Sequence, residues 1–350
     1  MTPFGGRVQG LRRARVEAST QFRDGRFRNP SGAGPGLQAG TRLNVMQDFL
    51  GPRPNRRPAG VMPLAPEAEV LTQWARSPDT GLRATWLGHS TVLLEVDGAR
   101  LLTDPVWGER VSPSAHVGPK RFHAAPVAIE ALPPLDAVII SHDHYDHLDY
   151  PSIRRLLAAQ SAPFVTSLGV GAHLEAWGVP AARIVELDWW ESFCVPGHEV
   201  QVTATPAQHF SGRGAFDRDR TLWSGWAVQG SRHNVYFSGD TGPTEDHTET
   251  GRRLGPFDLV MLEVGAWHAA WGAIHLGPSG ALEALRRLGG GAFLPVHWGT
   301  FDLGLHPWDE PVEHLLARAA ADTRLLLPKL GQVLEPGQVE GFEPWWRVVK

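Results

Sequence analysis

The segment Ser141-His142-Asp143-His144-Tyr145-Asp146-His147-Leu148-Asp149 constrains the fold of this chain more than any other feature. It follows directly on the apolar run AVII, so imidazoles and carboxylates crowd into one turn at the end of an expected strand. Where a backbone leaves a sheet, successive side chains can converge instead of alternating between faces. Borderline metals such as zinc choose this mixture of donors. The segment therefore predicts a metal site at a strand end.

Further candidate ligands obey the same rule, an apolar run followed by a metal-binding side chain. They are His209 after VQVTATPAQ, Asp240 after VYFSG and His297 after AFLPV. Gly239 would let the backbone approach closely beside Asp240, and strand ends on one sheet edge would bring distant residues together. The complete predicted ligand set is His142, His144, Asp146, His147, His209, Asp240 and His297.

Seven ligands suit two metal ions, each with an open position for a water that bridges them. This water, as a hydroxide, is the expected nucleophile, since metal binding lowers its pKa from about 15.7 toward roughly 7. Two ligand carboxylates offset about half the charge of two divalent cations, and the remainder suits a phosphate. We assign His142, His144 and His209 to the first ion, Asp146, His147 and His297 to the second, and Asp240 to the bridge.

The alternative interpretation is that these histidines are ordinary core or surface residues in a chain with 16 His. A chance HxHxDH match is expected in about one of several hundred such sequences, before any later ligand is required. The three later candidates, each at an expected strand end, lower that chance further.

Composition and charge narrow the class of protein. The formal charge of -4 provides no global field that would attract nucleic acid, so a local site must attract any anionic substrate. The single cysteine, Cys194, excludes an internal disulfide and a thiolate-rich metal site, and we expect a buried thiol. No apolar run approaches about 18 residues, and no signal peptide is evident. We expect a cytoplasmic protein, and no feature specifies its oligomeric state.

The chain divides into three segments. Residues 1–40 hold seven Arg, abundant Gly and few apolar residues, so we expect a mobile arm. Residues 41–81 are punctuated by proline, which predicts an extended segment packed on the body. The body, 82–350, starts with the β-like runs RATWLG, STVLLEV and ARLLTD, an expected antiparallel meander. Later strands alternate with helical patterns, which predicts an α/β fold, a four-layer αβ/βα sandwich.

The HxHxDH string, the later histidine, the Gly-Asp step and the last histidine resemble the metallo-β-lactamase superfamily. The strings GPKRF, HYDHLDY and TPAQH are similar to the N-acyl-phosphatidylethanolamine-hydrolysing phospholipase D group, over roughly residues 42–345. The resemblance implies the αβ/βα sandwich and a pair of zinc ions, although His/Asp sites also accept manganese or iron. It implies hydrolysis of the distal phosphodiester bond of an N-acylated phosphatidylethanolamine, which gives phosphatidic acid and an N-acylethanolamine.

The resemblance also assigns roles to other side chains. His275 is expected near the substrate phosphate or leaving group, where it would donate a hydrogen bond, and it joins Asp240 and Asp146 in the expected catalytic set. Lys120 and Arg121 are expected to face the phosphate as substrate-binding residues, and a solvated basic pair is their alternative.

Four more residues are candidates for supporting roles. Asp104 resembles an acceptor that orients a ligand imidazole, with a turn aspartate as the alternative. Asp143 and Asp149 are either acceptors around the ligands or solvated loop carboxylates. His89 is expected beneath the metals, with an ordinary structural histidine as its alternative.

Other functions stay open on the sequence. A lactone, ester or β-lactam hydrolase on the same scaffold is the first alternative, and a nucleic-acid phosphodiesterase is another, although the acidic charge argues against it. A metal-binding protein without turnover is disfavoured by the complete ligand set. The arginine-rich start would favour peripheral contact with an anionic membrane. Exposed tryptophans would strengthen such membrane contact, but core packing is the preferred interpretation of Trp189, Trp190, Trp345 and Trp346.

Overall fold

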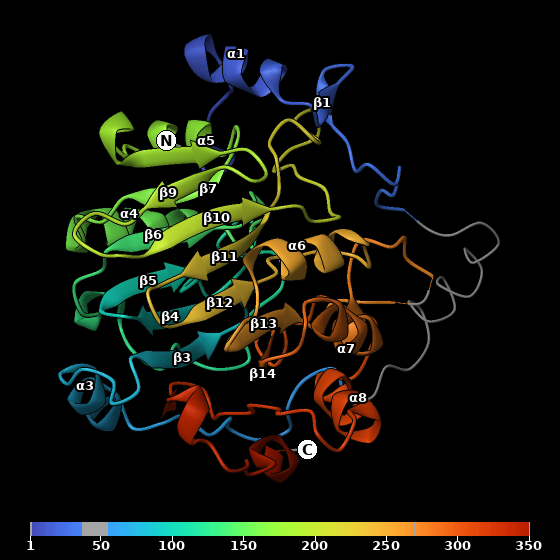
Figure 1. Ribbon diagram of the computed structural model, residues 1–350. Coiled ribbons are helices and arrows are strands. Elements are labelled where there is room, and N and C mark those ends of the chain that lie inside the picture. Colours follow the sequence, from blue (N-terminus) through green and yellow to red (C-terminus); the bar gives the residue numbers. More distant parts are fainter. Residues whose placement is uncertain (1, 37–54, 269, 350) are drawn as a thin grey trace.

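The computed structural model describes residues 2–36, 55–268 and 270–349. Two β-sheets lie against each other in the centre of the molecule, and helices cover their outer faces (Figure 1). This arrangement confirms the predicted four-layer αβ/βα sandwich.

The first sheet begins at Leu82, the predicted start of the body. Its order is β15 (Val333–Leu334), β3 (Leu82–Gly88), β4 (Thr91–Val96), β5 (Ala99–Thr103), β6 (Ala137–Ile140), β7 (Phe164–Ser167) and β8 (Ile184–Leu187). The expected meander is present, because β3, β4 and β5 pair antiparallel, and the strands from β5 to β8 pair parallel. The carboxyl ends of β3, β5 and β6 therefore point to the same edge.

The second sheet repeats this geometry. Its order is β14 (Ala292–Val296), β13 (Leu259–Glu263), β12 (Asn234–Phe237), β11 (Gly225–Gln229), β10 (Gln201–Thr205) and β9 (Ser192–Cys194). β12, β13 and β14 are parallel to one another. β11 pairs antiparallel with both β10 and β12, so β10 runs in the same direction as β12. The carboxyl ends of β10, β12, β13 and β14 therefore share one edge.

Alternating side chains of each strand fill two different cores. Leu94 and Ile139 face the second sheet and join the central core, whereas their neighbours Leu93 and Val138 face the helices outside the first sheet. Strands buried on both faces need near-continuous apolar runs such as AVII, which explains why the strand before the ligand string is apolar throughout. This double burial fixes the register with which the strand delivers its ligands.

Helices cover both outer faces of the sheets. α3 (Glu67–Trp74), α4 (Tyr150–Ala159) and α5 (Gly171–Ala176) bury apolar residues against the first sheet. α7 (Gly277–Arg287) and α8 (Glu310–Arg318) pack on the second, and α6 (Asp246–Leu254) contacts α7. The carboxylate of Asp149 accepts a hydrogen bond from Ser152 N at the start of α4, and Pro151 occupies the first turn. Asp149 is therefore a helix cap and not a solvated loop carboxylate. None of the described helices is long and apolar enough to cross a membrane.

The start of the chain packs on the body where we expected a mobile arm. Within 2–36 it forms α1 (Gly10–Ala18) and a hairpin of β1 (Phe22–Arg23) and β2 (Arg26–Phe27). Val16 and Phe27 are buried against Leu168 and Trp223, so the expectation was wrong for these residues. The arm has few apolar residues, but the ones it has fill a recess on the body. Residues 37–40 lie outside the described residues.

The second segment is described only from residue 55. Leu64 pairs with Leu330 of the body, and α3 buries Val70 and Trp74. Part of this segment is thus helical, where we expected extended chain. Residues 41–54 lie outside the described residues.

Two further expectations concern single side chains. Trp189, Trp345 and Trp346 are buried, which confirms core packing for them, and Trp190 is half-buried. Cys194 is exposed, so the expected buried thiol was wrong. Its strand, β9, is the edge strand of the second sheet and has little cover.

Candidate metal centre

Strand ends from both sheets bring all seven predicted ligands to one place. Four of them lie in the loop between β6 and α4, and single ligands follow β10, β12 and β14. Gly239 permits the close approach of the two sheets there, because a Cβ at this position would lie 2.6 Å from Ser141 Cβ and 2.9 Å from Ser224 O. Gly239, after β12, therefore lies against Ser141, after β6, with no room for a side chain of its own.

The first group of donors contains three imidazoles and one carboxylate. His144 Nδ1 lies 2.8 Å from His142 Nε2 and 3.2 Å from His209 Nε2. Asp240 Oδ2 lies 3.9 Å from His142 Nε2 and 3.7 Å from His209 Nε2. All four donor atoms fall within 4.8 Å of one another. Three nitrogens and one oxygen at this spacing suit a tetrahedral ion such as zinc.

The second group surrounds the carboxylate of Asp146. Its Oδ2 lies 3.2 Å from His297 Nε2 and 3.5 Å from His147 Nε2. Asp240 reaches this group too, with Oδ1 3.3 Å from His297 Nε2 and Oδ2 3.2 Å from His147 Nε2. Asp240 thus stands between the two groups, in the position that a bridging carboxylate requires.

Burial and unpaired atoms indicate that these residues fit a pair of cations. Burial lowers the pKa of His142 and of His209 well below the usual value, so both imidazoles are neutral and offer lone pairs. His147 Nε2 and Asp240 Oδ1 are buried and make no hydrogen bond among the described residues. Buried polar atoms without a partner are costly and need an explanation. Divalent ions would satisfy both atoms and accept the whole donor set.

Metal uptake is expected to release protons. Burial alone would lower the pKa of His297, but the carboxylates of Asp240 and Asp146 raise it to about 10. Without metal, His297 therefore holds a proton below that pH, whereas a ligand imidazole must be neutral. We expect zinc binding at about pH 7–8 to release at least one proton per chain, and the apparent affinity to fall as the pH falls.

Calorimetric titration of the metal-free protein in two buffers of different ionisation enthalpy measures this release. His297→Ala should release fewer protons, whereas the control His116→Ala, at an exposed position, should match the original protein. Zinc binding with the same heat in both buffers would contradict the predicted proton release.

Hydrogen bonds hold the ligand imidazoles in orientation. His147 Nδ1 donates to Asp104 Oδ2 at 2.7 Å, which confirms the predicted role of this aspartate. His209 Nδ1 donates to the carbonyl of Ile274 at 2.8 Å. Such partners fix the tautomer that leaves the other ring nitrogen free for metal.

Asp143 and a buried arginine fix the backbone of the ligand loop. Asp143 accepts hydrogen bonds from Gly212 N and Thr221 Oγ1, both at 2.8 Å, so it is a buried acceptor and not a solvated carboxylate. Arg213 Nη1 donates to the carbonyls of Asp143 and Leu148, at 2.6 and 2.8 Å. The hydrogen bonds of Asp143 and Arg213 therefore hold the backbone of the loop that carries four of the ligands.

The two basic candidates of the GPKRF string have other partners. Lys120 forms an ion pair with Glu109 at 2.7 Å, and nearly half of its side chain is exposed. Arg121 donates to the carbonyls of Val106 and Gly108, and its guanidinium lies 5.2 Å from the ring centre of Phe301. The structure thus gives Arg121 a role in holding a loop, and contact of either residue with a phosphate stays a prediction.

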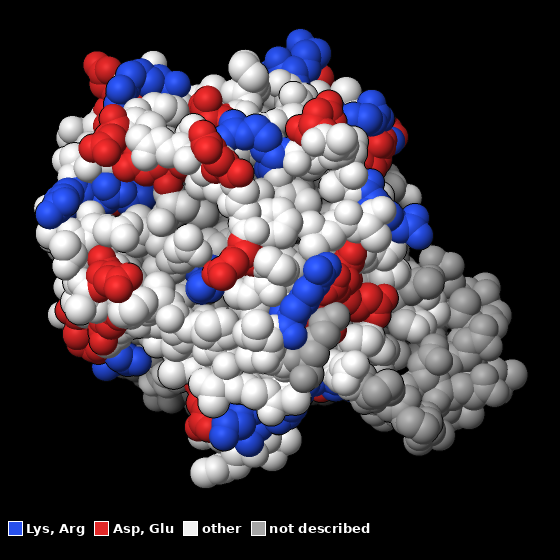
Figure 2. Space-filling model, turned by 90° about the horizontal axis from the view of Figure 1, so that it is seen from below, with Lys and Arg blue, Asp and Glu red and all other residues white. Residues whose placement is uncertain are grey.

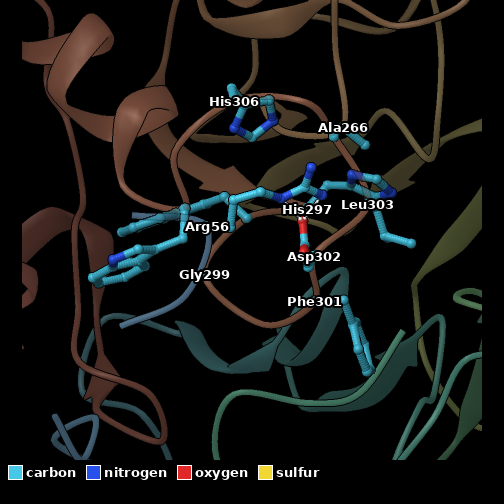
Figure 3. Close-up of a pocket in the computed structure, with 11 residues that line it drawn as sticks. Arg56, Ala266, His297, Gly299, Phe301, Asp302, Leu303 and His306 are labelled. Carbon is cyan, nitrogen blue, oxygen red and sulfur yellow. Dashed lines mark hydrogen bonds and ion pairs between the residues drawn. The ribbon is translucent and has the colours of Figure 1, made fainter. Parts of the chain in front are cut away.

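A narrow pocket borders the second group of donors. Arg56 crosses it toward Asp302, with His297 and His306 also on its walls (Figure 3). Arg56 Nε donates to Asp302 Oδ1 at 2.9 Å and fastens the loop after β14 to the segment before α3. The pocket measures about 10 Å³, room for about one water.

Two more buried residues belong to the site: His89, which was expected beside the metals, and Glu263, which the sequence analysis did not single out. His89 follows β3, and its Nε2 lies 3.0 Å from Asp146 Oδ2, while burial lowers its pKa to about 3. Glu263 ends β13, and its Oε1 lies 3.1 Å from His275 Nδ1. Glu263 is the last residue of an apolar strand, and a lone carboxylate at that position does not by itself indicate a site.

His275 lies beside both donor groups, as the predicted catalytic role requires. Its Nδ1 is 4.0 Å from Asp240 Oδ2, and its ring centre lies 5.0 Å from that of His209 and 5.7 Å from that of His297. Burial alone would lower the pKa of His275, but the charge of Glu263 raises it. A cationic imidazole here can bind an anionic oxygen held at the metal centre.

Comparison with known proteins agrees with this geometry. The sequence profile of the Beta-lactamase superfamily domain matches residues 99–298. An uncharacterised protein of Mycobacterium tuberculosis (strain H37Rv) is 46% identical over 341 residues, which is 96% of this chain and 90% of that protein. The N-acyl-phosphatidylethanolamine-hydrolyzing phospholipase D 1 of Caenorhabditis elegans is 38% identical over 273 residues, 73% of this chain and 76% of its own length.

A solved structure shows the same fold. The isothiocyanate hydrolase from Delia radicum gut bacteria superposes with a TM-score of 0.58 over 72% of this chain and 98% of its own, at 23% identity. The profile match, the relatives and the paired donor groups lead to one conclusion. The chain belongs to the metallo-β-lactamase superfamily and is a metal-dependent hydrolase.

Proposed function

We propose that this protein is a phosphodiesterase of phospholipase D type, which cleaves N-acyl-phosphatidylethanolamine or a closely similar lipid. Water adds across the bond between phosphorus and the ethanolamide oxygen. The water oxygen stays on phosphorus to give phosphatidic acid, and the ethanolamide oxygen leaves with a proton as N-acylethanolamine. The similarity to the nematode phospholipase D over 73% of this chain supports this choice of substrate.

One observation carries the proposal: two adjacent donor groups share Asp240 and contain only two carboxylates, Asp240 and Asp146. When bound, two divalent ions, zinc for preference, supply a water of lowered pKa and an excess of about two positive charges. This excess positive charge favours a singly charged, anionic phosphodiester over a neutral lactone or ester. Asp240 would be a ligand shared by both ions, and Asp146 would be a ligand of the second.

His275 adds a donor from the protein itself. His275 Nδ1 lies 4.0 Å from Asp240 Oδ2 and 3.1 Å from Glu263 Oε1. His275 is not a member of either four-residue donor group. We assign it a hydrogen bond to an oxygen of the phosphodiester, either a non-bridging oxygen or the departing ethanolamide oxygen. The donor offsets the negative charge that grows on that oxygen as the bond breaks.

The charge distribution favours a small anionic group over a polynucleotide. On the face that Figure 2 shows, Lys and Arg alternate with Asp and Glu over the surface. Nucleic-acid phosphodiesterases need a continuous basic track to hold the backbone. The formal net charge of -4 and the mixed charges on this face both favour a substrate that presents a single phosphate over a polynucleotide.

Turnover of matched substrates tests the proposal. Zinc-loaded protein is incubated with N-acyl-phosphatidylethanolamine in vesicles and in detergent micelles, and mass spectrometry quantifies both products. A lactone, a carboxylic ester, a β-lactam and single-stranded DNA are assayed in parallel, with metal-stripped protein as the control. We expect the diester lipid to be the best substrate, and release of N-acylethanolamine only with metal. Turnover of the lactone, the ester or the β-lactam without turnover of the lipid would replace the proposal.

A further inference from the structure

The carboxylate of Glu263 is fully buried at the end of β13 and faces the candidate site. Its Oε1 lies 3.1 Å from His275 Nδ1, and it accepts hydrogen bonds from Leu276 N at 2.9 Å and Thr241 N at 3.4 Å. Its Oε2 has no hydrogen-bond partner among the described residues. Glu263 therefore links Thr241, the residue after Asp240, to His275 and Leu276.

A buried carboxylate is costly unless a charge or several donors compensate it. The donors around Glu263 are two backbone N–H groups and one imidazole, and they all meet one oxygen. Of these three, only His275 can carry a positive charge. The imidazole is thus the natural counter-charge of Glu263, and the pair lies directly against the metal centre.

The contact also decides which nitrogen of His275 is available. Nδ1 faces Glu263, so the proton on Nδ1 is held by the carboxylate and Nε2 is the nitrogen left for a substrate. The side chain of His275 is 13% exposed, against 0–2% for His209 and Asp240. His275 is therefore the more accessible of these groups from solvent, as a residue that meets the substrate must be.

We propose that Glu263 is a positioning residue for the reaction. It holds His275 with Nδ1–H toward the carboxylate, balances the charge of the imidazolium, and so directs Nε2–H to an oxygen of the phosphodiester. This inference rests on the proposed function of the site. Two other roles would explain the same contacts: Glu263 only fixes the start of α7 through Leu276 N, or it binds metal together with Asp240 and His275, whose donor atoms lie within 4.8 Å of its own.

A double-mutant cycle separates these roles. Glu263→Gln keeps an oxygen for Leu276 N and Thr241 N but removes the charge opposite His275. We expect it to lower kcat by about 10²-fold, with a smaller change in KM and the zinc content of the original protein. His275→Ala should lower kcat at least as much, and the double variant should be no slower than His275→Ala alone, because Glu263 acts through His275.

Asp258→Asn is the matched control. Asp258 lies directly before the other end of β13, where it accepts a hydrogen bond from Asn234 N. The Asp258→Asn variant should have the same kcat as the original protein. Losses that multiply in the double variant, or a kcat of Glu263→Gln within about twofold of the original, would overturn the positioning role. Loss of zinc from Glu263→Gln would instead make Glu263 a metal ligand and would overturn it too.

An NMR measurement tests the contact without any substrate. In protein labelled with ¹⁵N-histidine, the His275 Nδ1–H signal is identified by its loss in His275→Ala. We expect this signal to shift in Glu263→Gln and to stay in place in Asp258→Asn. An unchanged signal would show that Glu263 does not hold Nδ1–H. If the original protein does not cleave the diester lipid, the proposed function fails, whereas this signal still decides the contact.

Discussion

Asp240→Asn is expected to lower kcat/KM for the lipid by at least about 10³-fold, which corresponds to about 4 kcal/mol. Among the described residues, Asp240 is the carboxylate that reaches both donor groups, with Oδ2 3.7 Å from His209 Nε2 in the first group and Oδ1 3.3 Å from His297 Nε2 in the second. An amide has the same shape but turns one acceptor into a donor and removes a negative charge. One of the two expected ion positions would lose its oxygen ligand, and both would lose the negative charge between them.

The fold should survive this change, because Asp240 lies in a loop after β12 and pairs with no strand. Steady-state rates, circular dichroism and thermal unfolding of the variant measure the two effects separately. Asp24→Asn, at a side chain that is 88% exposed, is the control and should keep full activity. Full turnover in Asp240→Asn would rule out the bridging role.

Arg213→Ala is expected to lower the free energy of unfolding by about 3–5 kcal/mol. Arg213 is buried and donates to the carbonyls of Asp143 and Leu148, and through Nε and Nη2 to the carbonyl of Pro3. Its guanidinium also lies 4.0 Å from the ring centre of Tyr145. Truncation leaves buried acceptors without donors and opens a cavity, and each of these effects is destabilising.

Urea unfolding, followed by tryptophan fluorescence, measures this loss as a lower midpoint at an unchanged slope. Arg218→Ala is the matched control from the same loop, because its side chain is half-exposed and pairs with Asp219 at the surface. The control should change stability by less than about 0.5 kcal/mol. If both variants unfold at the same midpoint, Arg213 is not the fastener of the ligand loop.

The ligand set was accessible from sequence because one local rule generates it. A buried strand is visible as an apolar run, and the side chain after it lies at a sheet edge where other strand ends meet. His209, Asp240 and His297 each follow this rule, and the structure brings them together with the loop after β6. Side chains that ligands need as partners, such as Asp104 after β5, follow the same rule.

What the sequence did not reveal depends on contacts between distant segments. Arg213 donates to Pro3, 210 positions away, and no local pattern announces a bond to a backbone carbonyl. The packing of Val16 and Phe27 was missed for the same reason, since the recess they fill is formed by residues such as Leu168 and Trp223. Glu263 has a different cause, because a lone carboxylate at a strand end gains meaning only once His275 is seen against it.

The pair of ions is the central claim, and its most direct measurement is the metal content of the purified protein. Zinc-loaded protein is dialysed against metal-free buffer, and inductively coupled plasma mass spectrometry gives the ions bound per chain. We predict two zinc ions per chain for the original protein and about one for His297→Ala, because this variant lacks a donor of the second group only. A value of one or none for the original protein, or of two for His297→Ala, would contradict the account.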